Sequence, residues 1–318
     1  MSKIGEDVGQ SGPISFRSHP YRQGARNVYL VTLPENHFGR FGPAPEIGVN
    51  KLLCGLGAAA LIGLGPQPAA ANSGSVVIRY DLTLAGLPIG TATLTVNVAD
   101  GGPYTIGAAA KVGGVISLIS DGRGSASATG RLGPVQPEPS TYALNTKSED
   151  KPQTVQMAIS DGTVTAVALN PELAPRPDRI PVTPANKHGV IDPLSALMVP
   201  VAGSGSALSP DACKRTLPVF DGAQRFDITL SYARTEQVKA KGYSGPAIVC
   251  SARYIPIAGH RPERAQTKFM IANRDLELWL TPINGTRVLA PWRIIVGTQI
   301  GRLRIDAARY GQSGGNSN

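Results

Sequence analysis

Two polar segments of the sequence carry side chains of the types used in acid–base chemistry. His260, Arg261 and Glu263 lie close together, and Asp221 stands earlier in the chain, immediately before a glycine. A histidine that titrates beside carboxylates suits general acid–base catalysis. The alternative is that both segments are ordinary turns with solvated charges. We therefore take Asp221, His260, Arg261 and Glu263 as candidate binding residues and assign no catalytic residue.

Strands are predicted on the chain next to both polar segments. Residues 224–233 follow Asp221, and residues 247–257 precede His260; the first of these strands alternates apolar and polar side chains. Such a period of two is typical of a half-buried β-strand. We expect four residues of that strand to face inward: Phe226, Ile228, Leu230 and Tyr232.

Strand signals recur along the chain and predict a mainly β fold. The further predicted strands are residues 76–84, 91–98, 104–111, 154–160, 163–169, 266–272, 276–280, 287–296 and 300–310. Short turns such as Asp161-Gly162 imply antiparallel pairing of neighbours. Because long sheet edges are rarely left open, we expect a large curved antiparallel sheet that closes into a barrel or half-barrel.

Helix signals are few, so one or two short helices are predicted. Residues 192–198 begin with Asp192 as a potential N-cap and Pro193 in the first turn. Residues 112–119 are a second candidate. The five prolines of residues 171–184 predict an extended crossover loop.

An export signal is predicted well inside the chain. Residues 52–64 are an apolar run of 13 residues that follows Lys51 and precedes Ala69-Ala70-Ala71. A membrane-spanning helix needs about 20 residues, whereas the apolar part of a signal peptide needs roughly 7–15. We predict cleavage before Asn72, which places the mature protein in the periplasm with no transmembrane segment.

The predicted signal divides the chain into four parts. Residues 1–48 are a non-native or disordered extension, because Val49 could be the true initiator. Residues 49–71 are the signal peptide, residues 72–310 a single β domain, and residues 311–318 a disordered tail rich in Gly, Ser and Asn.

Two of the three cysteines remain after this cleavage, Cys213 and Cys250. In an oxidising compartment such a pair is most simply a disulfide, and two separate buried thiols are the alternative. A metal site is not expected, because neither His188 nor His260 has ligand spacing to the cysteines. No cofactor is predicted.

The charge pattern argues against a nucleic-acid partner. The formal net charge is +9, but the basic residues are dispersed and only 5% of residues are aromatic. A nucleic-acid reader normally has a concentrated basic stripe or stacking aromatic side chains. A lipid or another envelope component is the expected partner, and no oligomeric state is predicted.

Several segments together resemble a known family. They are "TLPVFDGAQRFDI" (216–228), "CSARYIPIAGHRPE" (250–263), "LELWLTPINGTRVLAPWRIIVGTQIG" (276–301) and the residues 192–197. In their order along the chain, these segments resemble the exported bacterial family called domain of unknown function 3108 (DUF3108), over most of residues 75–310. The resemblance implies a Gram-negative envelope protein with a mostly β fold, and it supplies no activity and no catalytic residues.

Three classes of function remain open at this stage. The first is non-enzymatic binding of a lipophilic ligand, for which seven inward residues would line a cavity unless they simply fill the core: Ile78, Leu82, Leu94, Val96, Phe226, Ile228 and Leu230. The second is envelope scaffolding, with Trp279 and Trp292 as anchors if they are exposed. The alternative is a periplasmic hydrolase that uses a polar cluster around Asp221 and His260.

Overall fold

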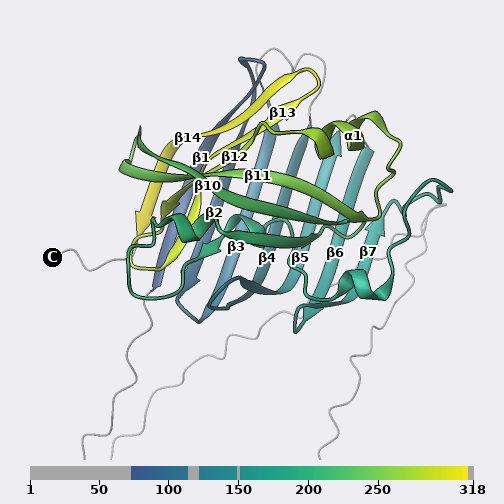
Figure 1. Cartoon of the computed structure of the whole chain (residues 1–318), viewed down its shortest axis with the longest axis horizontal. Helices are drawn as coiled ribbons and strands as arrows, with labels where there is room; N and C mark the ends of the chain where they lie inside the picture. Colours follow the sequence, from purple (N-terminus) through teal and green to yellow (C-terminus); the bar gives the residue numbers. More distant parts are fainter. Residues whose placement is uncertain (1–72, 114–121, 149–150, 314–318) are drawn as a thin grey trace, which may run out of the picture. The chain divides into compact units, whose positions relative to one another are not determined.

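The structure is a computed structural model that describes residues 73–113, 122–148 and 151–313 (Figure 1). The predicted extension, signal peptide and cleavage site therefore lie outside the described residues, as does most of the predicted 112–119 helix. Of the predicted tail, residues 311–313 belong to the last strand, and residues 314–318 lie outside the described part.

One antiparallel sheet of fourteen strands dominates the described residues. Its first seven strands are β1 (Ser73–Leu84), β2 (Leu87–Ala99), β3 (Pro103–Val112), β4 (Arg123–Leu132), β5 (Pro137–Ser148), β6 (Lys151–Ser160) and β7 (Thr163–Asn170). The others are β8 (Val199–Pro200), β9 (Arg215–Phe220), β10 (Arg225–Ala240), β11 (Tyr243–Ala258), β12 (Leu276–Pro282), β13 (Val288–Thr298) and β14 (Gly301–Ser313).

The sheet consists of a first meander, β1–β7, and a second meander, β9–β14, which join where β1 pairs with β14. Its order runs from β7 back to β1, then from β14 back to β9, and the short β8 pairs with β13. Strand β1 pairs with β14 along most of its length. The sheet stays open, with β7 and β9 as its edges, so the half-barrel form of the predicted fold is confirmed.

The crossover between β7 and β9 bridges these two edges. The N–H of Ile191 donates to the carbonyl of Pro218 at 2.9 Å, which places it beside β9 in a parallel bridge with Val219. The neighbouring N–H of Val190 donates to the carbonyl of Gly162, in the β6–β7 turn, at 3.0 Å. The backbone of the crossover therefore forms hydrogen bonds at both ends of the sheet, where the edge strands do not pair with each other.

A glycine in the β9–β10 turn lies at the contact between the two ends of the sheet. Gly222, in the β9–β10 turn, has a φ of +99° and packs against β6 and β7. A methyl group at this position would lie 2.6 Å from Cγ1 of Val155 and 3.4 Å from Cδ2 of Leu169. Figure 1 shows β10 and β11 passing in front of the strands of the first meander. The two ends of the strand order thus lie against each other.

Buried apolar side chains form two clusters. The larger joins the first meander to later strands, with Val96, Tyr104 and Trp292 among its members. The smaller one is built from strands of the second meander and from the crossover, which contributes Ile191 and Val199. The crossover is therefore part of the core from Val190 onward, whereas residues 171–184, predicted as an extended loop, are mostly exposed.

The predicted helix at residues 192–198 is only a single 3₁₀ turn, Ser195–Leu197. The Asp192 carboxylate still caps it, because its Oδ1 accepts the N–H groups of Leu194 and Ser195 at 2.9 Å each. The Ser195 hydroxyl donates to Oδ2 of Asp192 and lies 2.7 Å from the hydroxyl of Tyr104 on β3. These contacts tie the crossover to the first meander.

The predicted disulfide between Cys213 and Cys250 is present, with 5.4 Å between the two Cα atoms. Cys213 ends the 3₁₀ turn Pro210–Cys213 at the end of the crossover, and Cys250 lies in the middle of β11. Both residues are fully buried in the smaller cluster. The bond therefore anchors the crossover to the second meander.

The predicted strand 266–272 is wrong: these residues form the helix α1 (Ala265–Ala272). No described strand pairs with this segment, so its backbone N–H and C=O groups must be satisfied locally, as they are in a helix. Its residues Ala265, Lys268 and Met270 also favour a helix.

Other differences concern weakly patterned strands and one side chain. Strands β4, β5, β8 and β9 are not among the predicted strands: small polar residues leave little apolar alternation in β4 and β5, and β8 and β9 are short and contain a proline. Tyr232 was expected to face inward but is 41% exposed. It lies beyond Leu230, the last residue of β10 that pairs with β9, and beside a bulge before Arg234.

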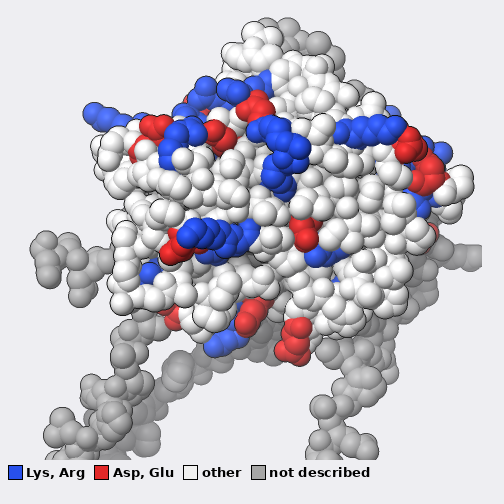
Figure 2. Space-filling view, viewed as in Figure 1, with Lys and Arg blue, Asp and Glu red and all other residues white. Residues whose placement is uncertain are grey.

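Several charged side chains on the outside of the sheet form ion pairs. Figure 2 shows Lys and Arg side chains beside Asp and Glu side chains over much of one face. On the second meander, the guanidinium groups of Arg234 and Arg293 lie 5.1 and 4.5 Å from the ring centre of Trp279. Arg293 is also paired with Asp306. The ion pairs thus cover an aromatic side chain.

Removing the disulfide should destabilise the protein. A double substitution, Cys213→Ala with Cys250→Ala, should lower the free energy of unfolding by about 2–4 kcal/mol, because it frees a loop of 37 residues in the unfolded chain. Urea denaturation of both proteins measures the difference. Dithiothreitol should lower the stability of the natural protein and leave the double variant unchanged; equal sensitivity of the two would contradict the disulfide.

Asp192 should make stability depend on pH. Burial raises its pKa above the ordinary value of 3.8, and the hydrogen bonds from Ser195 and Leu194 only partly oppose this. The folded state then binds the proton more tightly than the unfolded state, so this group lowers stability as the pH rises from about 3.8 through the raised pKa.

Two substitutions of Asp192 test this. Asp192→Ala should cost about 2–4 kcal/mol, because it removes a cap and leaves buried donors without an acceptor. Asp192→Asn keeps an oxygen for the two N–H groups, so it should cost less and flatten the stability profile above pH 3.8. Urea denaturation across the pH range measures both, and an unchanged profile in the Asn variant contradicts the assignment.

Candidate functional site

Two pairs of strands diverge in the second meander. Strand β11 pairs with β12 only where Ile248–Ser251 faces Glu277–Leu280. Past Ser251, β11 continues beside β10 to Ala258, whereas β12 stays beside β13. The chain between β11 and β12 contains α1. The divergence leaves a space between the two pairs of strands that no further strand fills.

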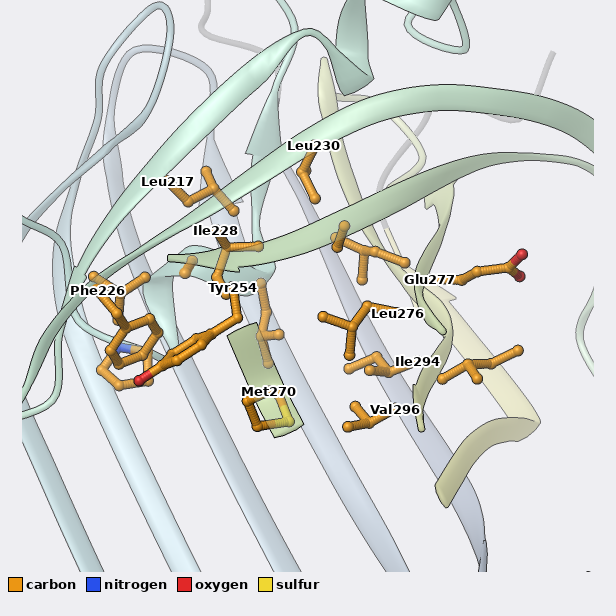
Figure 3. A pocket seen from close by; sticks show the side chains of 17 residues that line it. Leu217, Phe226, Ile228, Leu230, Tyr254, Met270, Leu276, Glu277, Ile294 and Val296 are labelled. Atoms are coloured by element: carbon orange, nitrogen blue, oxygen red, sulfur yellow. The ribbon is translucent and has the colours of Figure 1, made fainter. Parts of the chain in front are cut away.

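An apolar pocket of about 240 Å³ is lined by both pairs of strands (Figure 3). One wall consists of Phe226, Ile228 and Leu230 of β10 with Tyr254 of β11. The three β10 residues alternate along the strand, so their side chains share the face that is turned to the pocket. The period of two that is visible in the sequence therefore builds this wall.

The opposite wall and the remaining sides come from separate parts of the chain. Leu276 of β12 and Ile294 and Val296 of β13 form the second wall. Met270 reaches the pocket from α1, and Leu197 reaches it from the 3₁₀ turn of the crossover. Only the folded chain brings these five side chains together.

Among the lining residues, only Tyr254 and Glu277 have a side-chain oxygen. The Glu277 carboxylate is already bound: it accepts two hydrogen bonds from Arg234, at 2.9 and 3.1 Å, and one from Nε1 of Trp279 at 2.7 Å. The bond from Arg234 is the main reason why its pKa is lowered. Figure 3 shows this carboxylate pointing away from the other lining side chains.

The Tyr254 side chain is held by an aromatic contact. Its ring centre lies 5.2 Å from that of Phe226, and the two planes are tilted by 42°. Burial raises the pKa of the Tyr254 hydroxyl, and the nearby carboxylate of Asp221 raises it further. The hydroxyl therefore stays protonated at neutral pH and can donate a hydrogen bond.

Asp221 shapes the turn between β9 and β10. Its Oδ1 accepts the N–H groups of Ala223 and Gln224, at 2.8 and 2.6 Å, and its own N–H donates to the carbonyl of Gln224. Burial is the main cause of its raised pKa, and these hydrogen bonds act in the opposite direction. The side chain thus stabilises an ordinary turn.

His260 lies just past the end of β11, in contact with the crossover. Its carbonyl accepts the N–H of Ile180 at 2.9 Å. Its Nδ1 is buried and has no hydrogen-bond partner in the described part of the chain. Nothing in this environment provides the oriented carboxylate partner that a general base normally has.

Arg261 and Glu263 are engaged in separate ion pairs. Nε of Arg261 donates to Asp178 of the crossover at 2.7 Å. Glu263 pairs with Lys268 of α1 at 2.6 Å, and both side chains are more than half exposed. These contacts fasten the crossover and α1 to the end of β11.

The structure brings the two predicted polar segments near each other without joining their side chains. A methyl group at Gly259 would lie 2.0 Å from the carbonyl oxygen of Ala223, so the two turns are adjacent. Within residues 73–113, 122–148 and 151–313, no hydrogen bond or ion pair links Asp221 to His260, and neither residue lines the apolar pocket.

The expected inward residues separate into two groups. Phe226, Ile228 and Leu230 line the pocket. The other four belong to or pack against the larger cluster and do not line it: Ile78, Leu82, Leu94 and Val96. Trp279 and Trp292 are 8% and 3% exposed, so neither is available as a surface anchor.

Larger hollows have mixed walls that include charged residues. The hollow of about 530 Å³ has Arg215 and Arg287 in its lining, and the hollow of about 750 Å³ has Arg131 and Glu138. The described residues contain no group of three His, Cys, Asp or Glu residues placed to hold a metal ion. The helices described here are all too short or too polar to cross a bilayer.

Comparison with known proteins gives a family without an assigned activity. Among solved structures, the chain is similar to the crystal structure of a beta-barrel-like protein of domain of unknown function DUF1849 from Brucella abortus, with a TM-score of 0.46 and 10% identity, covering 77% of this chain and 99% of that chain. No curated protein matches. The family model described as "Protein of unknown function (DUF3108)" matches residues 79–308. Because this match covers most of the chain, the protein belongs to the DUF3108 family.

Proposed function

We propose that this protein binds the apolar part of a small lipophilic ligand in the pocket beside α1, without catalysing a reaction. The observation that carries the proposal is an apolar space of about 240 Å³ that the side chains leave unfilled. The pocket is partly open to the surface, and its almost wholly apolar lining distinguishes it from the larger hollows, whose linings are mixed. An apolar cavity of about 150 Å³ is enough to bind benzene.

The size of the pocket limits the ligand. Pockets that enclose drug-sized molecules measure about 300–1,000 Å³. A space of about 240 Å³ therefore suits one ring or part of an acyl chain, with the rest of a larger ligand outside. The apolar walls favour hydrocarbon through the hydrophobic effect.

The two other functions have less support. A hydrolase would need Asp221 and His260 to act together, but the carboxylate of Asp221 is committed to its own turn. A scaffold that docks through its tryptophans would need them on the surface, where Trp279 and Trp292 do not lie. No observation of this kind argues against ligand binding in the apolar pocket.

We further propose that the ligand is bound in the periplasm. The disulfide supports export, because such bonds persist in oxidising compartments and are rare in the cytosol. Strand β1 begins at Ser73, so cleavage before Asn72 would leave every described strand intact. A periplasmic protein would meet lipophilic molecules that pass between the two membranes.

Ligand binding can be tested with N-phenyl-1-naphthylamine, an apolar dye that becomes fluorescent when it leaves water. The natural protein should enhance its fluorescence in a saturable way. Ala252→Phe places a ring in the pocket, because Ala252 lines it, and should weaken binding at least about tenfold.

A matched control separates pocket filling from general disturbance. Ala109→Phe makes the same change at an exposed position of β3 and should leave dye binding unchanged. Melting curves should show that both variants fold. Equal dye binding by a folded Ala252→Phe variant, or no binding by the natural protein, would falsify the proposed site.

If the protein is exported, its mature form should have a defined N-terminus. When the chain is produced with its own leader in a Gram-negative host, protein from the periplasmic fraction should begin at Asn72 by N-terminal sequencing. Ala71→Leu should block cleavage, because the pocket of the signal peptidase takes a small residue there, whereas Ala70→Leu should still be processed. A cytosolic product that retains Met1 would refute export.

A further inference from the structure

One polar group of the pocket has no partner. The hydroxyl of the half-buried Tyr254 forms no hydrogen bond within the described residues, unlike the hydroxyl groups of three buried tyrosines: Tyr80 with Pro291, Tyr104 with Ser195, and Tyr310 with Thr281. Tyr142 also forms none, but it does not line the pocket. Partly buried hydroxyl groups usually find a partner when one is within reach.

The position of this hydroxyl is fixed. Figure 3 shows the Tyr254 ring beside Phe226, with its oxygen at the same end of the pocket as Phe226. The other lining residue with an oxygen, Glu277, has its carboxylate bound to Arg234 and Trp279. Any hydrogen bond from the pocket side chains to a ligand must therefore come from Tyr254.

The surroundings determine which ligand atom it can meet. The hydroxyl is a donor at neutral pH, because burial and the Asp221 carboxylate both keep it protonated. An oxygen that carries no charge can accept this hydrogen bond. A ligand carboxylate would find no Lys, Arg or His side chain among the lining residues to compensate its charge, so placing it in the pocket would cost energy.

We propose that the Tyr254 hydroxyl recognises the ligand by donating a hydrogen bond to an uncharged carbonyl or ester oxygen. The ligand is then an oxygenated amphiphile whose hydrocarbon part lies between β10 and β13, and whose carbonyl lies beside Phe226. Tyr254 is the residue that distinguishes such a ligand from plain hydrocarbon. This inference rests on the proposed binding function of the same pocket.

Two probes of similar size test the hydrogen bond. Acetophenone and ethylbenzene each have eight carbons, and only acetophenone has a carbonyl oxygen. Both should displace the dye N-phenyl-1-naphthylamine from the natural protein. Tyr254→Phe should weaken acetophenone binding about fivefold to tenfold and leave ethylbenzene binding unchanged, as expected for one lost hydrogen bond.

A matched variant and a charged probe complete the design. Tyr142→Phe removes another unbonded hydroxyl outside the pocket and should change neither affinity. Phenylacetate should displace the dye less well than acetophenone from the natural protein. Melting curves verify folding, which the small change from Tyr to Phe should preserve.

The outcomes separate the two proposals. If neither probe nor the dye binds the natural protein, the proposed function fails and this inference fails with it. If both probes bind and Tyr254→Phe affects them equally, or affects neither, ligand binding stands and the role of Tyr254 is overturned. If phenylacetate binds as tightly as acetophenone, the preference for an uncharged oxygen is overturned.

Discussion

The constraint on which the structure depends is that an open antiparallel sheet must satisfy both of its edges. Strands β7 and β9 end the strand order, and they do not pair with each other. The crossover solves the problem with its own backbone: Ile191 hydrogen-bonds beside β9, and Val190 bonds to the β6–β7 turn. The many prolines of the crossover do not prevent these contacts, because prolines lack only their own N–H groups and the donors here are Val190 and Ile191.

The same constraint explains why the crossover is anchored both in its middle and at its end. Asp192 and Ser195 bind it to Tyr104 of the first meander, and the disulfide of Cys213 ties its end to β11. Its apolar side chains then complete the smaller core cluster. A connection that bridges two sheet edges must be ordered, and ordering a long segment requires such compensating contacts.

Where β11 separates from β12, the two strands stop pairing, and the pocket lies between them. Helix α1 satisfies its own backbone there, and it sends Met270 toward the walls of the space. Polar side chains around this region are used for structure: Asp221 holds a turn, Arg261 binds Asp178, and Glu277 binds Arg234. What remains is an apolar space with one hydroxyl that has no hydrogen-bond partner in the described residues, and the proposed ligand binding is based on this combination.

The sequence by itself determined the mainly β class and the curved antiparallel sheet, because these follow from local alternation, and a count of the cysteines favoured a disulfide between Cys213 and Cys250 over two separate thiols. It also indicated the β10 wall of the pocket, since Phe226 and Ile228 share one face. Only the tertiary structure decided that the sheet stays open, that residues 265–272 form a helix, and that Leu197 and Met270 meet beside Tyr254. The physical reason is that these features depend on where strand pairing ends, and that depends on contacts between segments far apart in the chain rather than on the pattern within any one of them.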